Sequence, residues 1–235
     1  MAGDKYPFVS IVMPVRNERH YIQQSLEAVL AQDYPRQCME ILIVDGMSED
    51  GTREYVYEQQ GCVPNLRLLD NPGKIVPVGL NIAIAKAKGE IVVRVDGHCV
   101  IAPDYVRRCV EYLEREPVVG VGGPMETIGE TPTARTIALA MSSPFGVGNS
   151  AFRVRVNVHR YVDTIPFPAY RMSTLQAAGP FDETLIRNQD DEYNYRLRAM
   201  GGKLLFAPDV RSKYYSRSSL RALWKQYFQY GFFKV

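Results

Sequence analysis

The first 122 residues alternate short apolar runs with amphipathic segments, and this alternation restricts the chain to few folds. Five runs have the length and composition of buried strands, and the segments between them space their apolar residues as helices do. The expected strands are Phe8 to Val15, Met39 to Val44, Asn65 to Leu69, Glu90 to Val95 and Val118 to Gly122. Strand–helix–strand units of this length predict a mainly parallel sheet with helices on both faces, an α/β fold.

Four helices are expected between these strands. The first begins at Asn17 and Glu18, and the second runs from Ser48 through about Gln60. The third spans Val78 to Lys88, and the fourth extends from Pro103 to about Arg115. From Gly123 onward the pattern is less regular and indicates α+β structure packed on the same sheet. Short strands are expected at Tyr161 to Ile165 and Ala169 to Ser173, and a helix at Gln189 to Met200. No segment has the composition of a linker, so residues 1–235 are predicted to form one domain with halves 1–122 and 123–235.

Composition excludes several classes of protein. A net charge of +2 argues against a nucleic-acid-binding protein, which normally carries a strong basic excess. The four cysteines include no Cys-x-x-Cys pair, which fits a reducing compartment better than a disulfide framework. The sequence contains no signal-peptide-like N-terminus and no apolar run of membrane-spanning length. A cytoplasmic location is therefore expected.

Three of the expected strands end in small polar or acidic residues. The segments are Pro14-Val-Arg-Asn-Glu18, Asp45-Gly-Met-Ser48 and Asp96-Gly-His98. In a parallel sheet all three face the crevice at the carboxyl ends of the strands, where such folds bind ligands. A carboxylate and an imidazole placed together can hold a divalent cation. The alternative is that each acid only caps a helix or closes a turn.

Two common nucleotide-binding motifs are missing. No Gly-x-Gly-x-x-Gly follows the first strand, and no Gly-x-x-x-x-Gly-Lys-Ser/Thr occurs. This disfavours Rossmann dehydrogenases and P-loop NTPases. A bound nucleotide would have to be held without a glycine-rich phosphate loop, which increases the need for a metal ion.

A group of carboxylates begins the helix expected at Gln189. Asp190, Asp191 and Glu192 could supply a general base, or they could simply favour the positive end of that helix. Helical spacing places Asp190 and Asn194 on the same face as Leu197, and points Asp191 about 100° away.

Taken in order, these segments resemble the motifs of the family 2 inverting glycosyltransferases. Val9 to Glu18 resembles their opening strand, and Asp45-Gly-Met-Ser-Glu-Asp-Gly-Thr52 resembles their Asp-Asp-Gly-Ser-x-Asp-Gly-Thr signature. Gly73-Lys74 with Asn81 and Gly89 resembles the stretch before the metal motif, and Asp96-Gly-His98 stands where Asp-x-Asp is usual. Gln189 to Leu197 resembles Glu-Asp-x-Asp-Leu-x-x-Arg-Leu. The resemblance covers nearly the whole chain. Within the family, the Asp-Gly-His and Gln-Asp-Asp-Glu variants of the motifs are most like those of the bacterial succinoglycan-type glucosyltransferases.

The resemblance implies a GT-A fold, with a nucleotide-sugar-binding half at 1–122 and an acceptor-binding half at 123–235. It implies Asp190 as the catalytic base, and Asp96 and His98 as ligands of Mn²⁺ or Mg²⁺. The residues expected to contact the nucleotide are Pro14, Val15, Glu18, Asp45, Lys74, Asn81, Arg94 and Asp96. Those expected near the acceptor are Asp191, Gly148, Trp224 and Gln226.

Two departures from the family pattern have chemical consequences. His98 in place of Asp removes one negative charge and shifts the preference from Mg²⁺ towards Mn²⁺, because imidazole is the softer ligand. Gln189 in place of Glu removes another charge beside the expected base. The processive members' Gln-x-x-Arg-Trp is only partly matched by Gln226, so processivity is not predicted.

The expected function is inverting transfer of a hexose, expected to be glucose, from a UDP-sugar to a glycan or lipid-linked saccharide in polysaccharide biosynthesis. A nucleotidyltransferase is one alternative, although the Gly-rich basic loop expected after its first strand is missing at Arg16-Asn-Glu18. A non-catalytic domain that binds nucleotide sugars is the other alternative.

Aromatic residues crowd the last segment of the chain, from Trp224 to Phe233, and Lys225 and Lys234 accompany them. This composition is typical of a helix at a membrane interface, and the alternative is a helix that packs on the sheet. We expect this helix to lie on the inner face of the cell membrane. We also expect the natural protein to continue into a C-terminal membrane region that is absent from this chain.

Overall fold

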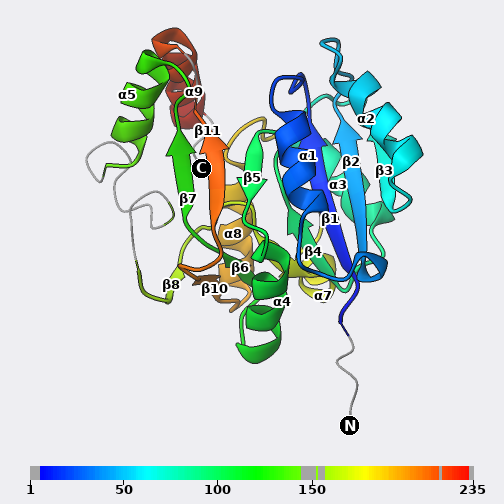
Figure 1. Ribbon diagram of the computed structural model, residues 1–235. Coiled ribbons are helices and arrows are strands. Elements are labelled where there is room, and N and C mark those ends of the chain that lie inside the picture. The colour runs from blue at the N-terminus through cyan, green and yellow to red at the C-terminus, as the bar shows by residue number, and fades with distance from the viewer. Residues whose placement is uncertain (1–5, 144–151, 153–156, 217–218, 233–235) are drawn as a thin grey trace.

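A computed structural model of the protein describes residues 6–143, 152, 157–216 and 219–232, and its core is one large sheet between helices (Figure 1). The strand order is β3-β2-β1-β4-β9-β6-β10-β8. The bounds are β1 Val9–Val15, β2 Met39–Asp45, β3 Leu66–Asp70, β4 Ile91–Arg94, β6 Gly120–Gly122, β8 Arg160–Val162, β9 Ala169–Arg171 and β10 Leu204–Phe206. Strand β1 pairs in parallel with both β2 and β4, whereas β9 is antiparallel to β4 and β6.

Helices cover both faces of this sheet, as the strand–helix alternation predicts. Strand β1 is buried along its whole length, and its alternate side chains enter two separate clusters. Ile11 packs with helices α1, α2 and α4, and Val12 packs with α3, α7 and α8. The bounds are α1 Ile22–Leu30, α2 Thr52–Cys62, α3 Val76–Lys86, α4 Tyr105–Arg115, α7 Met172–Ala178 and α8 Gln189–Ala199, with a short 3-10 helix, η1, at Arg36–Cys38.

A second, smaller sheet lies beside the first, with the order β5-β11-β7. Its strands are β5 Cys99–Ile101, β7 Met125–Ile128 and β11 Ser212–Tyr215. Helices α5 (Pro132–Met141) and α9 (Leu220–Phe232) contact each other next to this sheet, at the upper left of Figure 1. Because β5 follows His98 directly, its pairing with β11 brings the Asp96-Gly-His98 turn against the second half of the chain.

The α/β fold and its mainly parallel first half are confirmed, and the errors in the expected elements have local causes. The helix expected from Asn17 begins only at Ile22, because Asn17 has a left-handed φ of 53° and residues 19–21 form a turn. The strand expected to reach Ser173 ends at Arg171, where α7 begins at Met172. The additional elements are strands β5, β7, β10 and β11, helices α5 and α7 and the short helix η1.

A buried polar network joins β1, β2 and the start of β4. Ser10 Oγ donates a hydrogen bond to Glu40 Oε1 at 2.7 Å, and the backbone N–H of Lys88 donates to the same oxygen at 2.6 Å. The N–H of Gly89 donates to Ser10 Oγ at 2.8 Å. The backbone of Gly89 is so close to β1 that an added Cβ would lie 2.4 Å from the Ser10 nitrogen.

We therefore predict that Gly89→Ala lowers the free energy of unfolding by about 1–3 kcal/mol, because the methyl group must push β1 and β4 apart. Gly61→Ala is the matched control, because Gly61 lies in α2 and its Cβ would meet nothing within 4 Å. Alanine there is expected to stabilise the helix by up to about 1 kcal/mol. Urea unfolding of both variants measures the difference, and equal stabilities would contradict the close approach at Gly89.

Candidate active site

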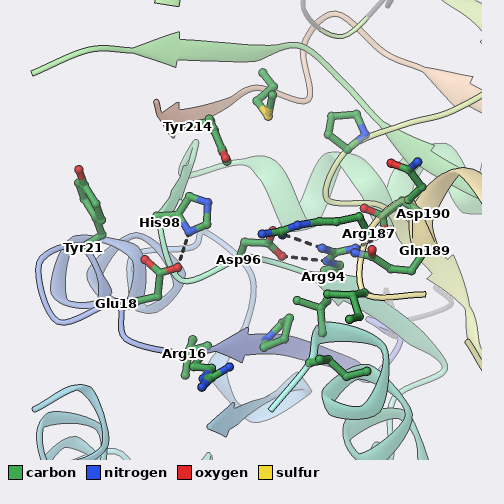
Figure 2. A pocket seen from close by; sticks show the side chains of 18 of the residues that line it. Arg16, Glu18, Tyr21, Arg94, Asp96, His98, Arg187, Gln189, Asp190 and Tyr214 are labelled. Carbon is green, nitrogen blue, oxygen red and sulfur yellow. Dashed lines mark hydrogen bonds and ion pairs between the residues drawn. The ribbon is translucent and has the colours of Figure 1, made fainter. Parts of the chain in front are cut away.

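The carboxyl ends of β1 and β4 and the start of α8 border a cleft of about 990 Å³. The two strands are neighbours in the sheet, and α8 reaches the same edge from the second half of the chain (Figures 1 and 2). The ionisable side chains that line the cleft include Glu18, Arg94, Asp96, His98, Asp190 and Asp191. This is the concave, polar end of an α/β sheet at which such folds bind ligands.

Arg94, the last residue of β4, joins two carboxylates that are far apart in sequence. Its Nε donates to Asp96 Oδ1 at 2.8 Å and its Nη2 donates to Asp96 Oδ2 at 3.2 Å, while Nη1 donates to Asp190 Oδ1 (Figure 2). Only 8% of the arginine side chain is exposed. Burial alone would lower the pKa of Arg94, but the charges of Asp190 and Asp96 outweigh it and raise that pKa. The guanidinium is thus a permanent charge shared between the two acids.

Asp190 lies in the first turn of α8, and 38% of its side chain remains exposed. Burial raises the pKa of its carboxyl above the ordinary value, and the charge of Arg94 opposes that rise. Asn194, one turn later, is fully buried and is bonded to Tyr170 and Thr164, which fixes α8 against β9. The position of Asp190 is therefore set by the helix on one side and by Arg94 on the other.

His98 and Glu18 form a second pair across the cleft. The ring nitrogen Nδ1 lies 2.8 Å from Glu18 Oε1, so a proton on Nδ1 is donated to the carboxylate. The imidazole also packs edge-on against Tyr214, with ring centroids 4.8 Å apart. A carboxylate on one ring nitrogen fixes the orientation of a histidine and leaves Nε2 as the nitrogen that can bind a ligand.

The residues at this edge fit a divalent cation that is shared with a substrate. Among the described residues, no three His, Cys, Asp or Glu side chains form a complete metal site. Asp96 and His98 offer one carboxylate and one imidazole, which is the incomplete protein ligand set of cations that also coordinate substrate phosphates. Both Asp96 oxygens accept hydrogen bonds from Arg94, so this carboxylate already has a positive partner.

Asp45, the last residue of β2, supports the site without lining the cleft itself. Its carboxylate is fully buried and accepts hydrogen bonds from the N–H of Ser48 at 3.0 Å and from Ser48 Oγ at 2.5 Å. Ser48 Oγ in turn accepts from the N–H of Asn17 at 2.9 Å, and Thr52 Oγ1 accepts from the N–H of Glu18 at 2.9 Å. The Asp45–Thr52 segment therefore holds the turn that presents Glu18 to His98.

The structure brings most of the predicted site residues together and leaves others apart. Those that line the cleft are Pro14, Val15, Glu18, Lys74, Arg94, Asp96, His98, Asp190 and Asp191. Asp45 and Asn81 are not in the lining: Asp45 is fully buried, and Asn81 forms hydrogen bonds with the Phe181 backbone and with Glu183. Trp224 is 68% exposed and is not in the lining. Gly148 and the side chain of Gln226 lie outside the described part of the chain.

The cleft also contains residues that the motifs did not select. Tyr21 and Tyr214 flank His98. Arg187 lies three residues before Asp190, outside α8, and donates to Gln229 of α9 at 3.1 Å. Arg187 is close in sequence to Gln189-Asp190 and could have been found there. The position of Tyr214 follows only from the pairing of β11 with β5, which carries no local sequence signal.

Comparison with known proteins identifies the family. The model of glycosyl transferase family 2 matches residues 10–176. A Methanococcus voltae protein, the dolichyl N-acetyl-alpha-D-glucosaminyl phosphate 3-beta-D-2,3-diacetamido-2,3-dideoxy-beta-D-glucuronosyltransferase, is 31% identical over 95% of this chain and 72% of its own length. The succinoglycan biosynthesis protein ExoA of Rhizobium meliloti is 31% identical over 98% of this chain and 71% of its own length.

Solved structures agree in fold. Mannosyltransferase PcManGT from Pyrobaculum calidifontis, in complex with GDP-Man and Mn²⁺, has a TM-score of 0.73 at 23% identity, over 94% of this chain and 61% of that one. S. aureus TarS 1-349 in complex with UDP has a TM-score of 0.66 at 18% identity, over 92% of this chain and 62% of that one. At these identities the likeness concerns the fold, and this chain spans less than two thirds of either structure. Since the family model covers most of the sequence and two relatives are 31% identical over nearly all of it, the chain belongs to glycosyl transferase family 2 and has the GT-A fold.

Proposed function

We propose that this glycosyltransferase domain transfers a hexose from a UDP-sugar, with inversion and with the help of a divalent cation, to a glycan or lipid-linked saccharide. The observation that carries the proposal is the position of Asp190, whose carboxylate faces the carboxyl edge of β4 across the shared guanidinium of Arg94. One side of the cleft thus offers a base, and the other side offers ligands for a diphosphate and its cation.

The chemistry requires one carboxylate and no covalent nucleophile. Asp190 accepts the proton of an acceptor hydroxyl while that oxygen forms a bond to the anomeric carbon of the donor. The bond from the anomeric carbon to the diphosphate breaks on the opposite face, and UDP leaves with the electron pair. The raised pKa of Asp190 suits this role, because it brings the base nearer to neutral pH. Asp191 lines the same cleft and lies on the acceptor side in this proposal.

Two sets of cleft residues would bind the donor. Pro14, Val15 and Lys74 line the part of the cleft next to β1, where the nucleoside would lie. Asp96 and His98 would hold the cation, which supplies positive charge for the departing diphosphate. The complex of TarS with UDP supports a uridine donor, and the Mn²⁺ in the PcManGT complex supports a metal. The name of the Rhizobium meliloti relative, which specifies succinoglycan biosynthesis, supports polysaccharide biosynthesis as the pathway. Glucose as the hexose is part of the proposal.

The acceptor side adjoins an exposed apolar stripe on α9, which we call the α9 stripe. It consists of Leu220, Trp224, Phe228 and Phe232, which are 60–74% exposed and follow each other at four-residue intervals. Arg221 and Lys225 are exposed beside it, and α9 contains no acidic residue. Tyr227 of the same helix lines the cleft. Aromatic rings beside basic side chains favour an anionic bilayer surface.

We propose that the α9 stripe rests on the cytoplasmic face of a membrane and places the cleft near lipid-linked acceptors. The name of the Methanococcus voltae relative, which specifies a dolichyl phosphate sugar, supports this class of acceptor. No helix within the described ranges has the length and hydropathy needed to span a bilayer.

Asp190→Asn is expected to lower the transfer rate by about 10²- to 10⁴-fold, because an amide cannot take up the proton. UDP affinity is expected to stay within a few-fold of the wild type, because the amide oxygen can still accept a hydrogen bond from Arg94 Nη1. Asp191→Asn is the matched comparison at the next position: it also loses one charge, but as an acceptor-side residue it is expected to raise the KM for the acceptor more than it lowers kcat. UDP release with Mn²⁺ and a panel of acceptors gives the rates, and calorimetry gives the affinity. A nearly wild-type rate in Asp190→Asn would assign the base to Asp191. Absence of acceptor-dependent UDP release by the wild type with every donor would favour the non-catalytic alternative.

Asp96→Ala and His98→Ala are both expected to weaken Mn²⁺-dependent UDP binding, with the larger loss in Asp96→Ala, which removes a charge as well as a ligand. His98→Asp should retain activity and shift the preference from Mn²⁺ towards Mg²⁺. Titrations of UDP in the presence of each metal measure these effects. Unchanged metal dependence in His98→Ala would show that the imidazole serves only to pack against Tyr214 and Glu18.

The wild-type chain is expected to float with anionic liposomes, and Trp224→Ser/Phe228→Ser is expected to stay with the soluble fraction. Removing the two rings deletes apolar surface worth about 1.5–3 kcal/mol for each ring that becomes fully buried. Tyr57→Ser/Tyr195→Ser is the matched control, because both tyrosines are 69% exposed on other helices. Equal flotation of all three chains, or of none, would contradict membrane contact through the α9 stripe.

A further inference from the structure

The charges of Arg94, Asp96 and Asp190 do not balance. One guanidinium serves two carboxylates, and it uses Nε and Nη2 for Asp96 and Nη1 for Asp190. The arginine is almost completely enclosed, with 8% of its side chain exposed, whereas 20% of Asp96 and 38% of Asp190 are exposed. The two acids are therefore the accessible ends of a buried bridge (Figure 2).

The bridge occupies the atoms that a cation would need. Both oxygens of Asp96 accept hydrogen bonds from Arg94. A divalent cation bound to one of these oxygens would lie within a few ångströms of the guanidinium, and like charges at such distances repel strongly in a partly buried site. Arg94 can withdraw from Asp96 and keep a carboxylate partner, because Asp190 remains bonded to Nη1. The free-energy cost of this withdrawal is small, because Asp190 ensures that the buried guanidinium is not left unpaired.

We propose that Arg94 is a positioning residue that competes with the divalent cation for Asp96, so that cation binding transfers the guanidinium fully to Asp190. The inference rests on the proposed function in one respect, the assignment of the cation to Asp96. Arg94 then has two consecutive roles. In the empty cleft it holds the two carboxylates at a fixed separation, and in the loaded cleft it orients Asp190 towards the acceptor.

If Arg94 competes with the cation, its substitution should increase the affinity for the cation, which is opposite to the usual effect of a mutation in a binding site. Loss of a residue that only maintains the structure weakens ligand binding, whereas loss of a competitor strengthens it. Arg94→Met keeps most of the side-chain volume and removes both the charge and the fork of N–H groups. Arg94→Lys keeps the charge but cannot bond both Asp96 oxygens and Asp190 together.

The control is Arg16→Met. Arg16 lines the same cleft and its removal changes the net charge equally, but it is exposed and its Nη1 donates to the backbone oxygen of Lys74 at 3.4 Å. It therefore reports the long-range effect of deleting one positive charge, which solvent screens.

The experiment measures Mn²⁺ affinity by electron paramagnetic resonance of free Mn²⁺, without donor or acceptor, after circular dichroism shows that each variant is folded. We expect Arg94→Met to bind Mn²⁺ about tenfold more tightly than the wild type, Arg94→Lys a few-fold more tightly, and Arg16→Met within about twofold. If Arg94→Met does not fold, Arg94→Lys decides the question by the same comparison.

Arg94 variants that bind Mn²⁺ no more tightly than Arg16→Met would overturn the inference, as would absence of Mn²⁺ binding by every chain. Neither result depends on turnover. Acceptor-dependent UDP release by the wild type therefore tests the proposed function separately, and it can succeed while the competition by Arg94 fails.

Discussion

Parallel pairing of β1 with β2 on one side and β4 on the other determines where this protein can perform chemistry. In this register Val15 lies opposite Asp45, and Val12 lies opposite Arg94, so the strands end at one edge of the sheet. The strands themselves are buried along their length, and among their charged residues only Arg94, at the end of β4, lines the cleft. The polar residues that follow them in sequence are therefore collected above the sheet, where Glu18, Asp96 and His98 border one cleft.

Charges around the cleft are organised as pairs that cross between elements. The Glu18–His98 pair connects the turn after β1 to the turn after β4, and Arg94 connects β4 to α8. Asp45 does not reach the cleft and acts through Ser48, whose hydroxyl donates to Asp45 and accepts a hydrogen bond from the N–H of Asn17. A ligand that enters the cleft thus meets groups whose orientation is already fixed, which reduces the entropy lost on binding.

The first half of the fold could be predicted because its signals are local. Apolar runs such as Met39–Asp45 have the length of strands, and the acids follow them within a few residues. The small sheet could not be predicted in this way, because Ser212 pairs with Ile101 and Met125 across long sequence separations. The site shows the same division. The position of Asp190 in the motif was enough to predict that it lies in the cleft. The contact of its carboxylate with Arg94 could not be predicted, because it forms only when α8 docks.

Arg94 and Asp190 are 96 positions apart in the sequence. This separation affects the order in which the parts of the cleft can form during synthesis. The βαβ units of the first half are formed from neighbouring segments, so they can fold as they leave the ribosome. At that stage the chain has Arg94 and Asp96, but the helix that carries Asp190 has not yet been made. The guanidinium of Arg94 therefore has Asp96 as its carboxylate partner from the first half alone, and the cleft acquires its far wall and its second acid only when α8 docks.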